Sequence, residues 1–239
     1  MNPRFYLDAD LTTGQALALP DPVAHHALRV LRLRAGTAIT LFNGRGGEYA
    51  AALLADGQAR IGNFDPVERE SPVATTLLQA WVAVDKLDWI VEKATELGAA
   101  RIVLWPAERS VVRLAGERLA RRLAHLRAVT EAACCQCGRN RLPAVLAADS
   151  LAAALAATDA TAKLLLDPTG APLAQQTAQA RSIAFLVGPE GGLSSTEQAL
   201  ADRHGWCPAR LGERVLRTET AGLAALAAVA VLASGNSHG

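Results

Sequence analysis

The feature that most constrains this chain is an alternation, from residue 77 onward, of short apolar runs with longer segments of helical periodicity. The apolar runs are Leu77–Val84, Ile102–Trp105, Lys163–Leu166 and Ile183–Val187. Runs of this kind are typical of strands buried inside a parallel sheet. Strands that alternate with helices predict an α/β domain in which helices cover the faces of that sheet.

Three segments predict well-defined helices. The first is expected to begin at Asp85, acting as N-cap, and to end at Gly98, with its apolar side chains on one buried face. The second is long and amphipathic, with Leu119, Leu123, Leu126 and Ala133 facing inward and Arg118, Arg121 and Arg122 largely outward. The third, Thr218–Ser234, is rich in alanine and closes the chain.

The first seventy residues predict a separate, β-rich module. Thr37–Phe42 alternates in the strand manner, Asn43-Gly44 is a favoured hairpin turn, and Glu48–Leu54 can return as the partner strand. Residues 64–76 have the proline-containing composition of a linker. The predicted domains are therefore residues 1–70 and residues 74–235.

A short helix is expected before this hairpin, between the start signal Asp21-Pro22 and the stop signal Gly36. A basic stripe at i, i+4 and i+7 of this helix is formed by His25, Arg29 and Arg32. The apolar stripe beside it is formed by Ala24, Leu28 and Leu31. The basic stripe is either an RNA contact or a solvated charged face.

Charge is concentrated in two segments, although the net charge of the 239 residues is only +1. Residues 22–47 hold Arg29, Arg32, Arg34 and Arg45, with only Glu48 nearby. Residues 101–141 hold nine arginines against three glutamates. Two basic segments on a nearly neutral chain predict a local face for a polyanion such as RNA. The alternative is that arginine simply stands in for lysine, which occurs only three times.

Composition narrows the class of protein further. Since 51% of the residues are hydrophobic, a sizeable core can form. The N-terminus lacks the apolar core of a signal peptide, and the run Leu223–Ala233 is too short to cross a bilayer. We therefore expect a soluble cytoplasmic protein without a membrane partner.

The four cysteines match neither a disulfide framework nor a zinc site; they are residues 134, 135, 137 and 207. This spacing predicts reduced structural thiols and no metal.

A glycine-rich turn, Gly188-Pro189-Glu190-Gly191-Gly192, follows the run Ile183–Val187 directly. Ser194 to Glu197 then form a capping box, which predicts the start of a helix. A strand, a glycine turn and a helix in this order commonly form a small-molecule site at the carboxyl edge of a parallel sheet. The turn is neither a Walker loop nor a dinucleotide fingerprint. An ordinary tight turn is the alternative explanation.

A second segment, Leu211–Ala221, is polar and charged, yet it leads into the most apolar helix of the chain. Thr218 can cap that helix, so that its N-terminal amides face the neighbouring turn. Arg217 and Glu219 flank the junction. They can serve a bound ligand, or they can form an ion pair at the start of the helix.

Together, Gly188–Gly192 and Leu211–Ala221 closely resemble the cofactor loops of the SPOUT methyltransferases. The remainder resembles one member family, the 16S ribosomal RNA uridine-N3 methyltransferases. Its N-terminal β-barrel, similar to PUA-type RNA-binding domains, is matched by His25–Gly36 and Asn43–Gly47. Its middle signatures are matched by Lys86–Gly98, Glu108-Arg109-Ser110 and Gln136–Pro143. The chain departs from the family at Cys135, where a glutamate is usual, and at Cys137, where a small residue is usual.

The resemblance implies a fold, a cofactor and partners. The fold is a SPOUT-type parallel sheet with a C-terminal trefoil knot, preceded by a small PUA-like β-barrel, in a homodimer. The residues implied to bind S-adenosylmethionine are Leu166, Gly188, Pro189, Glu190, Gly191, Gly192, Leu211, Gly212, Val215, Leu216, Arg217, Thr218, Thr220 and Ala221. The residues implied to contact RNA are His25, Arg29, Arg32, Arg34 and Arg45.

The implied reaction is methylation of N3 of a uridine in the decoding region of 16S ribosomal RNA, within the small subunit. N3 must lose its proton, so an arginine beside the base would stabilise the developing anion. The catalytic candidates are Arg217, Arg109 and Arg139, with Glu219 as orienter or proton acceptor. Each of them can instead belong to a structural salt bridge. Two rival functions are a SPOUT enzyme that acts on transfer RNA and a non-catalytic, RNA-binding ribosome assembly factor.

Overall fold

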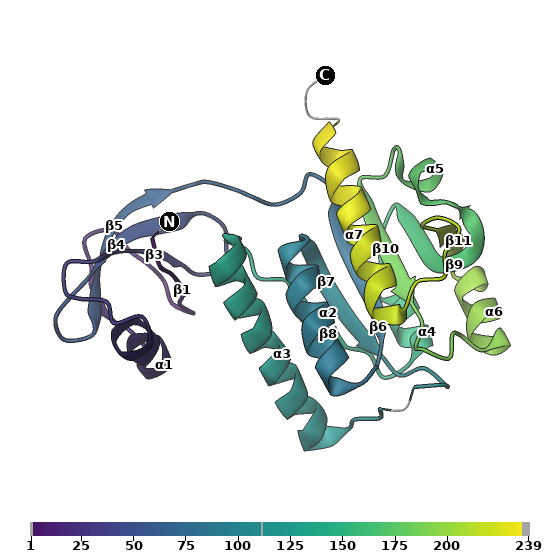
Figure 1. The fold of residues 1–239 in the computed structure, drawn as a ribbon, viewed down its shortest axis with the longest axis horizontal. Coiled ribbons are helices and arrows are strands. Elements are labelled where there is room, and N and C mark those ends of the chain that lie inside the picture. The colour runs from purple at the N-terminus through teal and green to yellow at the C-terminus, as the bar shows by residue number, and fades with distance from the viewer. Residues whose placement is uncertain (1, 111, 236–239) are drawn as a thin grey trace. The chain divides into compact units, whose positions relative to one another are not determined.

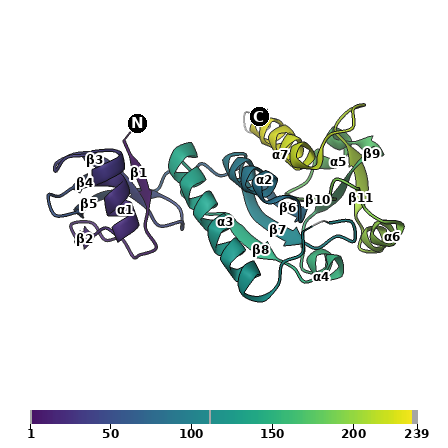
Figure 2. The same cartoon turned by 60° about the horizontal axis from the view of Figure 1, so that its bottom comes forward.

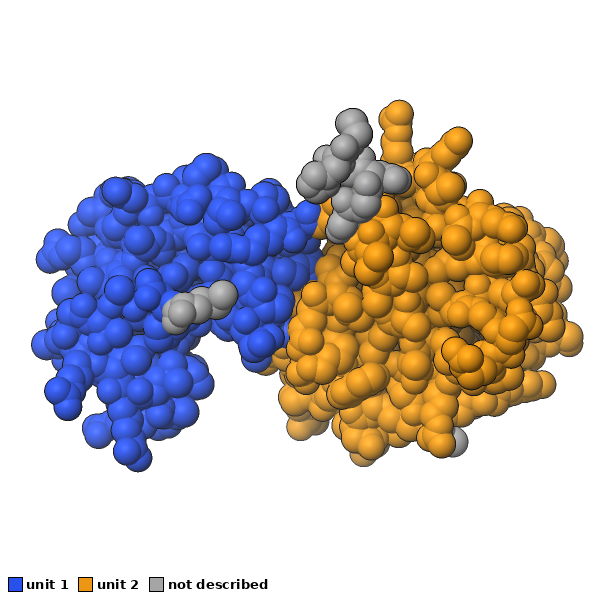
Figure 3. Space-filling view, turned by 45° about the horizontal axis from the view of Figure 1, so that its top comes forward, with its two compact units in different colours: residues 1–70, 131–142 blue, residues 71–130, 143–239 orange. Residues whose placement is uncertain are grey.

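The computed structural model describes residues 2–110 and 112–235, which divide into two compact units (Figure 3). The first unit contains the chain up to Glu70 together with Glu131–Leu142. The second contains Ser71–Thr130 and the chain from Pro143 onward. The sequence division near residue 70 did not foresee that Glu131–Leu142, which lies far along the chain, packs with the N-terminal residues.

The first unit is built on a five-stranded sheet. Its strands are β1 (Arg4–Tyr6), β2 (Ala16–Ala18), β3 (Ala38–Phe42), β4 (Glu48–Leu53) and β5 (Gln58–Asp65), in the order β1-β3-β4-β5-β2. The predicted hairpin is confirmed, because β3 and β4 pair antiparallel. The predicted linker begins too early, since Phe64 pairs with Tyr49 and Asp65 with Glu48.

The helix of the first unit is shorter and less regular than predicted. Its α-helical part, α1 (Asp21–His25), continues into a π-helical turn, His26–Val30. The Leu31 amide donates to the His26 carbonyl oxygen, five residues back, at 2.9 Å. The wider turn ends the helix before Arg32, whose φ of 54° is left-handed. The predicted stripe of His25, Arg29 and Arg32 therefore does not lie on one regular helix.

The second unit contains a six-stranded sheet in which every neighbouring pair is parallel (Figure 1). Its strands are β6 (Ala74–Ala80), β7 (Ala99–Trp105), β8 (Ala144–Ala147), β9 (Ala162–Pro172), β10 (Ser182–Val187) and β11 (Cys207–Arg210), in the order β11-β9-β10-β6-β7-β8. Its helices are α2 (Val84–Glu96), α3 (Gly116–Cys137), α4 (Leu151–Ala156), α5 (Leu173–Thr177), α6 (Ser195–Arg203) and α7 (Thr218–Gly235). The predicted α/β class is confirmed.

Each face of this sheet carries its own hydrophobic core, because successive strand residues point to opposite faces. Leu77 packs with apolar residues of α2 and α7, whereas its neighbour Leu78 packs with α4 and α6 (Figures 1 and 2). Helix α7 lies very close to the sheet at Gly222, where a Cβ atom would meet Leu77 Cδ1 at 2.8 Å. This contact fixes the start of α7 against the strands that carry the site.

Several predicted elements differ in detail. Strand β6 ends at Ala80, and α2 begins at Val84 without a side-chain cap, so Asp85 lies in the first turn and is not the N-cap. The predicted outward Arg122 folds back onto α2, where it bonds the Val84 carbonyl oxygen and Asp88. The short elements β8, α4, α5 and β11 were not predicted. Among the described helices, none combines the length and apolarity needed to span a membrane.

Candidate small-molecule site

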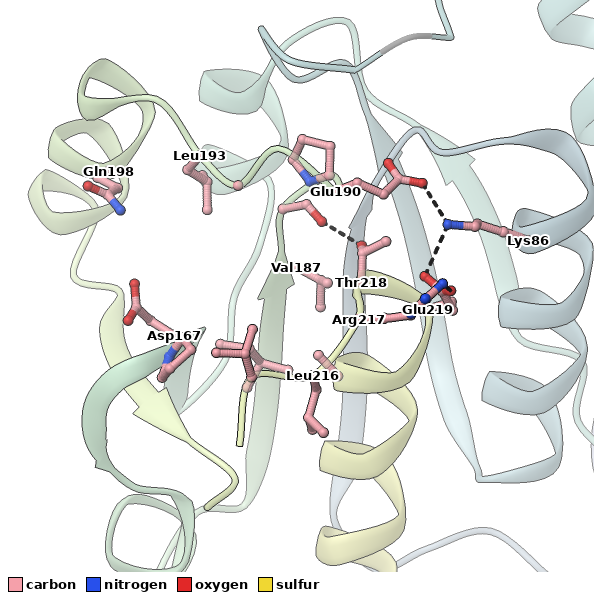
Figure 4. A pocket seen from close by; sticks show the side chains of 17 residues that line it. Lys86, Asp167, Val187, Glu190, Leu193, Gln198, Leu216, Arg217, Thr218 and Glu219 are labelled. Atoms are coloured by element: carbon pink, nitrogen blue, oxygen red, sulfur yellow. Dashed lines mark hydrogen bonds and ion pairs between the residues drawn. The ribbon is translucent and has the colours of Figure 1, made fainter. Parts of the chain in front are cut away.

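The main cavity of the second unit opens at the carboxyl edge of the sheet and has a volume of about 580 Å³ (Figure 4). It is formed by the loop after β10, the segment before α7, the middle of β9 and the start of α2. Its lining residues are Lys86, Leu166, Asp167, Pro168, Val187, Gly188, Pro189, Glu190, Gly192, Leu193, Gln198, Val215, Leu216, Arg217, Thr218, Glu219 and Ala221. The cavity has an apolar wall and a charged edge.

Thr218 ties the two predicted loops together. Its hydroxyl donates to the Gly188 carbonyl oxygen at 2.6 Å (Figure 4). The same hydroxyl accepts a hydrogen bond from Gln79 Nε2 at 3.0 Å. Thr218 is the first residue of α7, and its side chain serves the loop after β10 instead of capping the helix as predicted. The end of β10 and the start of α7 are thereby held side by side.

The charged edge is organised by Lys86, which lies between two carboxylates (Figure 4). Lys86 Nζ is 3.0 Å from Glu190 Oε1 and 3.5 Å from Glu219 Oε2. The bond to Glu190, supported by Glu219, raises the pKa of Lys86. Burial raises the pKa of Glu190, but bonds from its own backbone amide and from Lys86 outweigh burial, so that pKa is lowered. Lys86 and Glu190 are both charged at neutral pH.

Hydrogen bonds also join the loop after β7 to the glycine turn and to the start of α6. The predicted capping box is confirmed, since Ser194 and Glu197 exchange hydrogen bonds at the start of α6. The buried Glu197 carboxylate also accepts from the Glu108 amide at 2.9 Å. Arg109 donates to the Gly191 carbonyl oxygen at 2.7 Å. Two loops that follow different strands are thus fixed to each other.

Gly191 packs closely against Arg109, a contact that the sequence did not reveal. A Cβ atom at Gly191 would lie 3.3 Å from both Cβ and Cδ of Arg109. Gly191 is not among the described residues that line the cavity. The missing side chain therefore makes room for Arg109.

The four catalytic candidates lie in different places. Arg217 and Glu219 line the cavity, with 3.9 Å between Arg217 Nη1 and Glu219 Oε1, and the Arg217 side chain is 82% exposed. Arg109 is bound to the glycine turn. Arg139 belongs to the first unit, where its buried guanidinium pairs with Glu70 at 2.5 Å.

Most of the predicted cofactor residues line the cavity. Leu211 and Gly212 instead line a smaller neighbouring cavity of about 50 Å³, which shares with the first the residues Leu166, Asp167, Pro168, Leu216 and Ala221. Gly191 and Thr220 are not among the described lining residues of either. The lining residues that the sequence prediction missed are Lys86, Asp167, Pro168, Val187, Leu193 and Gln198.

The five residues proposed to contact RNA are all exposed in the first unit. Arg45 forms an exposed ion pair with Asp10 at 2.6 Å. Among the residues that the structure describes, Arg29, Arg32 and Arg34 have no carboxylate partner. These three guanidinium groups are available to an external anion.

The segment Glu131–Leu142 is held in the first unit by buried polar contacts. Arg4 and Arg69 both pair with Glu48, and Arg4 also bonds Asn140 at 2.6 Å. Burial raises the pKa of Glu48, but hydrogen bonds from Arg69, Arg4 and Asn140 outweigh burial and lower it to about 2. Burial raises the pKa of the Cys134 thiol to about 12. Cys134 therefore stays protonated, as expected of a structural cysteine.

A parallel sheet with a cavity at its carboxyl edge defines a ligand-binding α/β protein. The model of the RNA methyltransferase domain matches residues 69–230, and the model of the RNA methyltransferase PUA domain matches residues 19–58. A relative from Mycobacterium bovis, ribosomal RNA small subunit methyltransferase E, is 33% identical, and the match covers 96% of this chain and 92% of the relative. The enzyme of that name from Bacillus subtilis is 27% identical, with 86% of each chain covered.

Solved structures agree with these matches. Ribosomal RNA small subunit methyltransferase E from Neisseria gonorrhoeae, solved bound to S-adenosylmethionine, has a TM-score of 0.89 and 38% identity, over 97% of this chain and 98% of that one. A methyltransferase from Legionella pneumophila, solved with the same cofactor, has a TM-score of 0.90 and 33% identity, with 98% of each chain covered. The chain belongs to the RNA methyltransferase family, in the group of the ribosomal RNA small subunit methyltransferases E.

Proposed function

We propose that this protein methylates N3 of one uridine in the decoding region of 16S ribosomal RNA, with S-adenosylmethionine as methyl donor. The observation that carries the proposal is the cavity between the two glycine-containing loops, in a chain whose relatives are ribosomal RNA methyltransferases. Exposed arginines in a unit that matches an RNA methyltransferase PUA domain support an RNA substrate. The ribosomal RNA methyltransferases among the relatives favour ribosomal over transfer RNA as the target.

The residues of the cavity suit S-adenosylmethionine. Its volume of about 580 Å³ lies within the range of small-molecule sites, roughly 300–1,000 Å³. Leu166, Val187 and Leu216 provide an apolar wall for an aromatic ring, while the glycine turn exposes backbone groups. Carboxylates at the charged edge complement the positive charges of the ligand. The cofactor supplies a methyl group already activated by its sulfonium, so the protein has to supply position and electrostatics.

In the proposed reaction, Arg217 and Glu219 act on the target base. The exposed Arg217 guanidinium can reach a uracil outside the cavity and stabilise the anion that forms when N3 loses its proton. Glu219, with 17% of its side chain exposed beside Lys86, orients the base or accepts that proton in this proposal. Arg109 assists by fixing the glycine turn. Arg139, paired with Glu70, is a structural residue in this proposal.

The proposed assembly is a homodimer with a trefoil knot near residues 188–221 and a PUA-like barrel in the first unit. The partner subunit would complete the RNA site, and the substrate would be the assembled small subunit. Light scattering at micromolar concentration is expected to give the mass of a dimer. A monomer would remove the idea of a shared site while leaving the cofactor cavity in place.

Single-turnover methyl transfer to ribosomal RNA tests the chemistry. Arg217→Lys is expected to slow transfer about a hundredfold, because an ammonium cannot bridge two acceptors as a guanidinium does. Glu219→Gln is expected to slow it and to change how the rate varies with pH. Calorimetry should show that both variants still bind S-adenosylmethionine. Near-normal rates in both would mean that these residues only hold the loop before α7.

A further inference from the structure

Two exposed aliphatic side chains lie between two arginines of the first unit that have no carboxylate partner among the described residues. Val30 is 58% exposed and Leu31 is 43% exposed. Arg29 and Arg32 flank them in sequence, and neither has a carboxylate partner among the residues described. Two adjacent exposed aliphatic residues between guanidinium groups require a physical explanation, since no described residue of the first unit forms an ion pair with these arginines.

The backbone conformation accounts for this exposure. A regular α-helix would place Leu31 on the same face as Ala24 and Leu28, which pack against the core. In the structure the helix instead ends in the π-helical turn, and Leu33, two residues after Leu31, packs against the core while Leu31 stays exposed. The left-handed Arg32 completes the change of direction. This conformation is unfavourable for a residue with a Cβ atom, and π-turns and strained residues are frequent at binding sites.

We propose that Val30 and Leu31 form an apolar wedge that packs against bases of single-stranded RNA, while Arg29, Arg32 and Arg34 contact the adjacent phosphates. The inference rests on the proposed function for the class of partner. Charge complementarity supports it, because residues 22–47 contain no acidic side chain. Aliphatic side chains can insert between nucleic-acid bases, and proteins read RNA mainly where its bases are unstacked.

The test measures binding of a single-stranded oligoribonucleotide and of the same strand with abasic residues, over a series of salt concentrations. Val30→Ser/Leu31→Ser is expected to lower affinity for the intact strand about tenfold and to remove the preference for the intact over the abasic strand. The slope of log affinity against log salt should not change, because the phosphate contacts remain. Arg29→Gln/Arg32→Gln should lower that slope by about 1.4, since each phosphate contact on a single strand contributes about 0.7, and should keep the preference for bases.

Phe64→Ser is the matched control, because Phe64 is another exposed apolar residue of the first unit, at 48%. Leu31→Met should bind as the unchanged protein does, and far-ultraviolet circular dichroism should show that every variant is folded. Unchanged affinity and base preference in Val30→Ser/Leu31→Ser would overturn the wedge, and would fit a protein partner at this surface instead. Failure of the proposed function would be distinct: the unchanged protein would then lack S-adenosylmethionine binding and methyl transfer.

Discussion

The two basic segments of the chain resemble each other in composition and differ in what their arginines contact. In residues 22–47, Arg29, Arg32 and Arg34 are exposed, without carboxylate partners among the described residues. In residues 101–141, many arginines are engaged. Arg109 bonds Gly191, Arg121 pairs with Glu117, Arg122 with Asp88, Arg139 with Glu70 and Arg141 with Glu68.

This difference teaches that a count of charges in a sequence window does not identify free charges. The partners of Arg122, Arg139 and Arg141 lie outside the segment that contains these arginines. The fold neutralises much of the more basic segment and leaves the less basic one available to an anion. We therefore propose RNA contact for the first segment, and structural roles for the five engaged arginines of the second.

The largest effect is expected from Arg139→Met, which leaves Glu70 without its buried partner. Breaking a buried ion pair typically costs about 3–5 kcal/mol. Thermal or denaturant unfolding should show this loss. Arg32→Met, at an unpaired position, should change the free energy of unfolding by less than about 0.5 kcal/mol. Equal effects at the two positions would contradict the distinction between engaged and free arginines.

Acid should weaken the contacts of Glu131–Leu142 within the first unit. The pKa of Glu48 is lowered to about 2 by its bonds to Arg69, Arg4 and Asn140. Because the folded protein favours the ionised carboxylate, Glu48 stabilises the fold at pH values above its unfolded pKa, near 4.5. This stability is lost as the pH falls from there toward 2. This shift in the pKa corresponds to roughly 3 kcal/mol in the free energy of unfolding. Glu48→Gln should remove this dependence from the unfolding curves between pH 5 and pH 2, within about 1 kcal/mol; an unchanged slope would show that Glu48 is not responsible.

Charge reversal should show that the two basic segments contribute differently to RNA binding. Arg29→Glu/Arg32→Glu is expected to weaken binding of single-stranded RNA at least roughly tenfold and to lower the salt slope by about 1.4, since each phosphate contact contributes about 0.7. Cofactor affinity should stay the same. The matched control is Arg121→Glu/Arg141→Glu in the engaged segment, which should change the slope less. A larger change in the control would reverse the assignment of the two segments.

The smallest effect concerns Arg45, which is exposed but paired with Asp10. Asp10→Asn would free Arg45 for a phosphate. Because exposed ion pairs contribute little, up to about 1 kcal/mol, RNA affinity should rise only about twofold, as measured by fluorescence anisotropy. Weaker binding would show that Asp10 itself takes part in the RNA contact.

The sequence predicted the parts of the fold that depend on local pattern. The buried strands β6, β7, β9 and β10 carry apolar runs, and the start of α6 carries its capping box. Strand β11 was missed because Cys207–Arg210 lies at an edge of the sheet and is partly exposed, so it lacks such a run. The π-helical turn was missed because the apolar pattern of residues 24, 28 and 31 is that of a regular helix, whereas Leu33 is the residue that packs against the core.

The same division applies to the candidate site. The loop Gly188–Gly192 follows a recognisable strand, so its place at the sheet edge could be predicted. Asp167 and Pro168 could have been found by the same rule, because they follow the run Lys163–Leu166. The pairing of Lys86 with Glu190 spans 104 positions and depends on tertiary structure. No spacing in the sequence could indicate it.

The most direct test of the central claim is mass mapping of the methylated nucleoside. Small ribosomal subunits from a strain that lacks this protein would be incubated with the purified protein and S-adenosylmethionine. The expected result is a single N3-methyluridine in the decoding region of 16S ribosomal RNA, formed in the presence of the cofactor. A methyl group on another base, on a ribose or on transfer RNA would contradict the claim, as would unmodified RNA after incubation with folded, cofactor-binding protein.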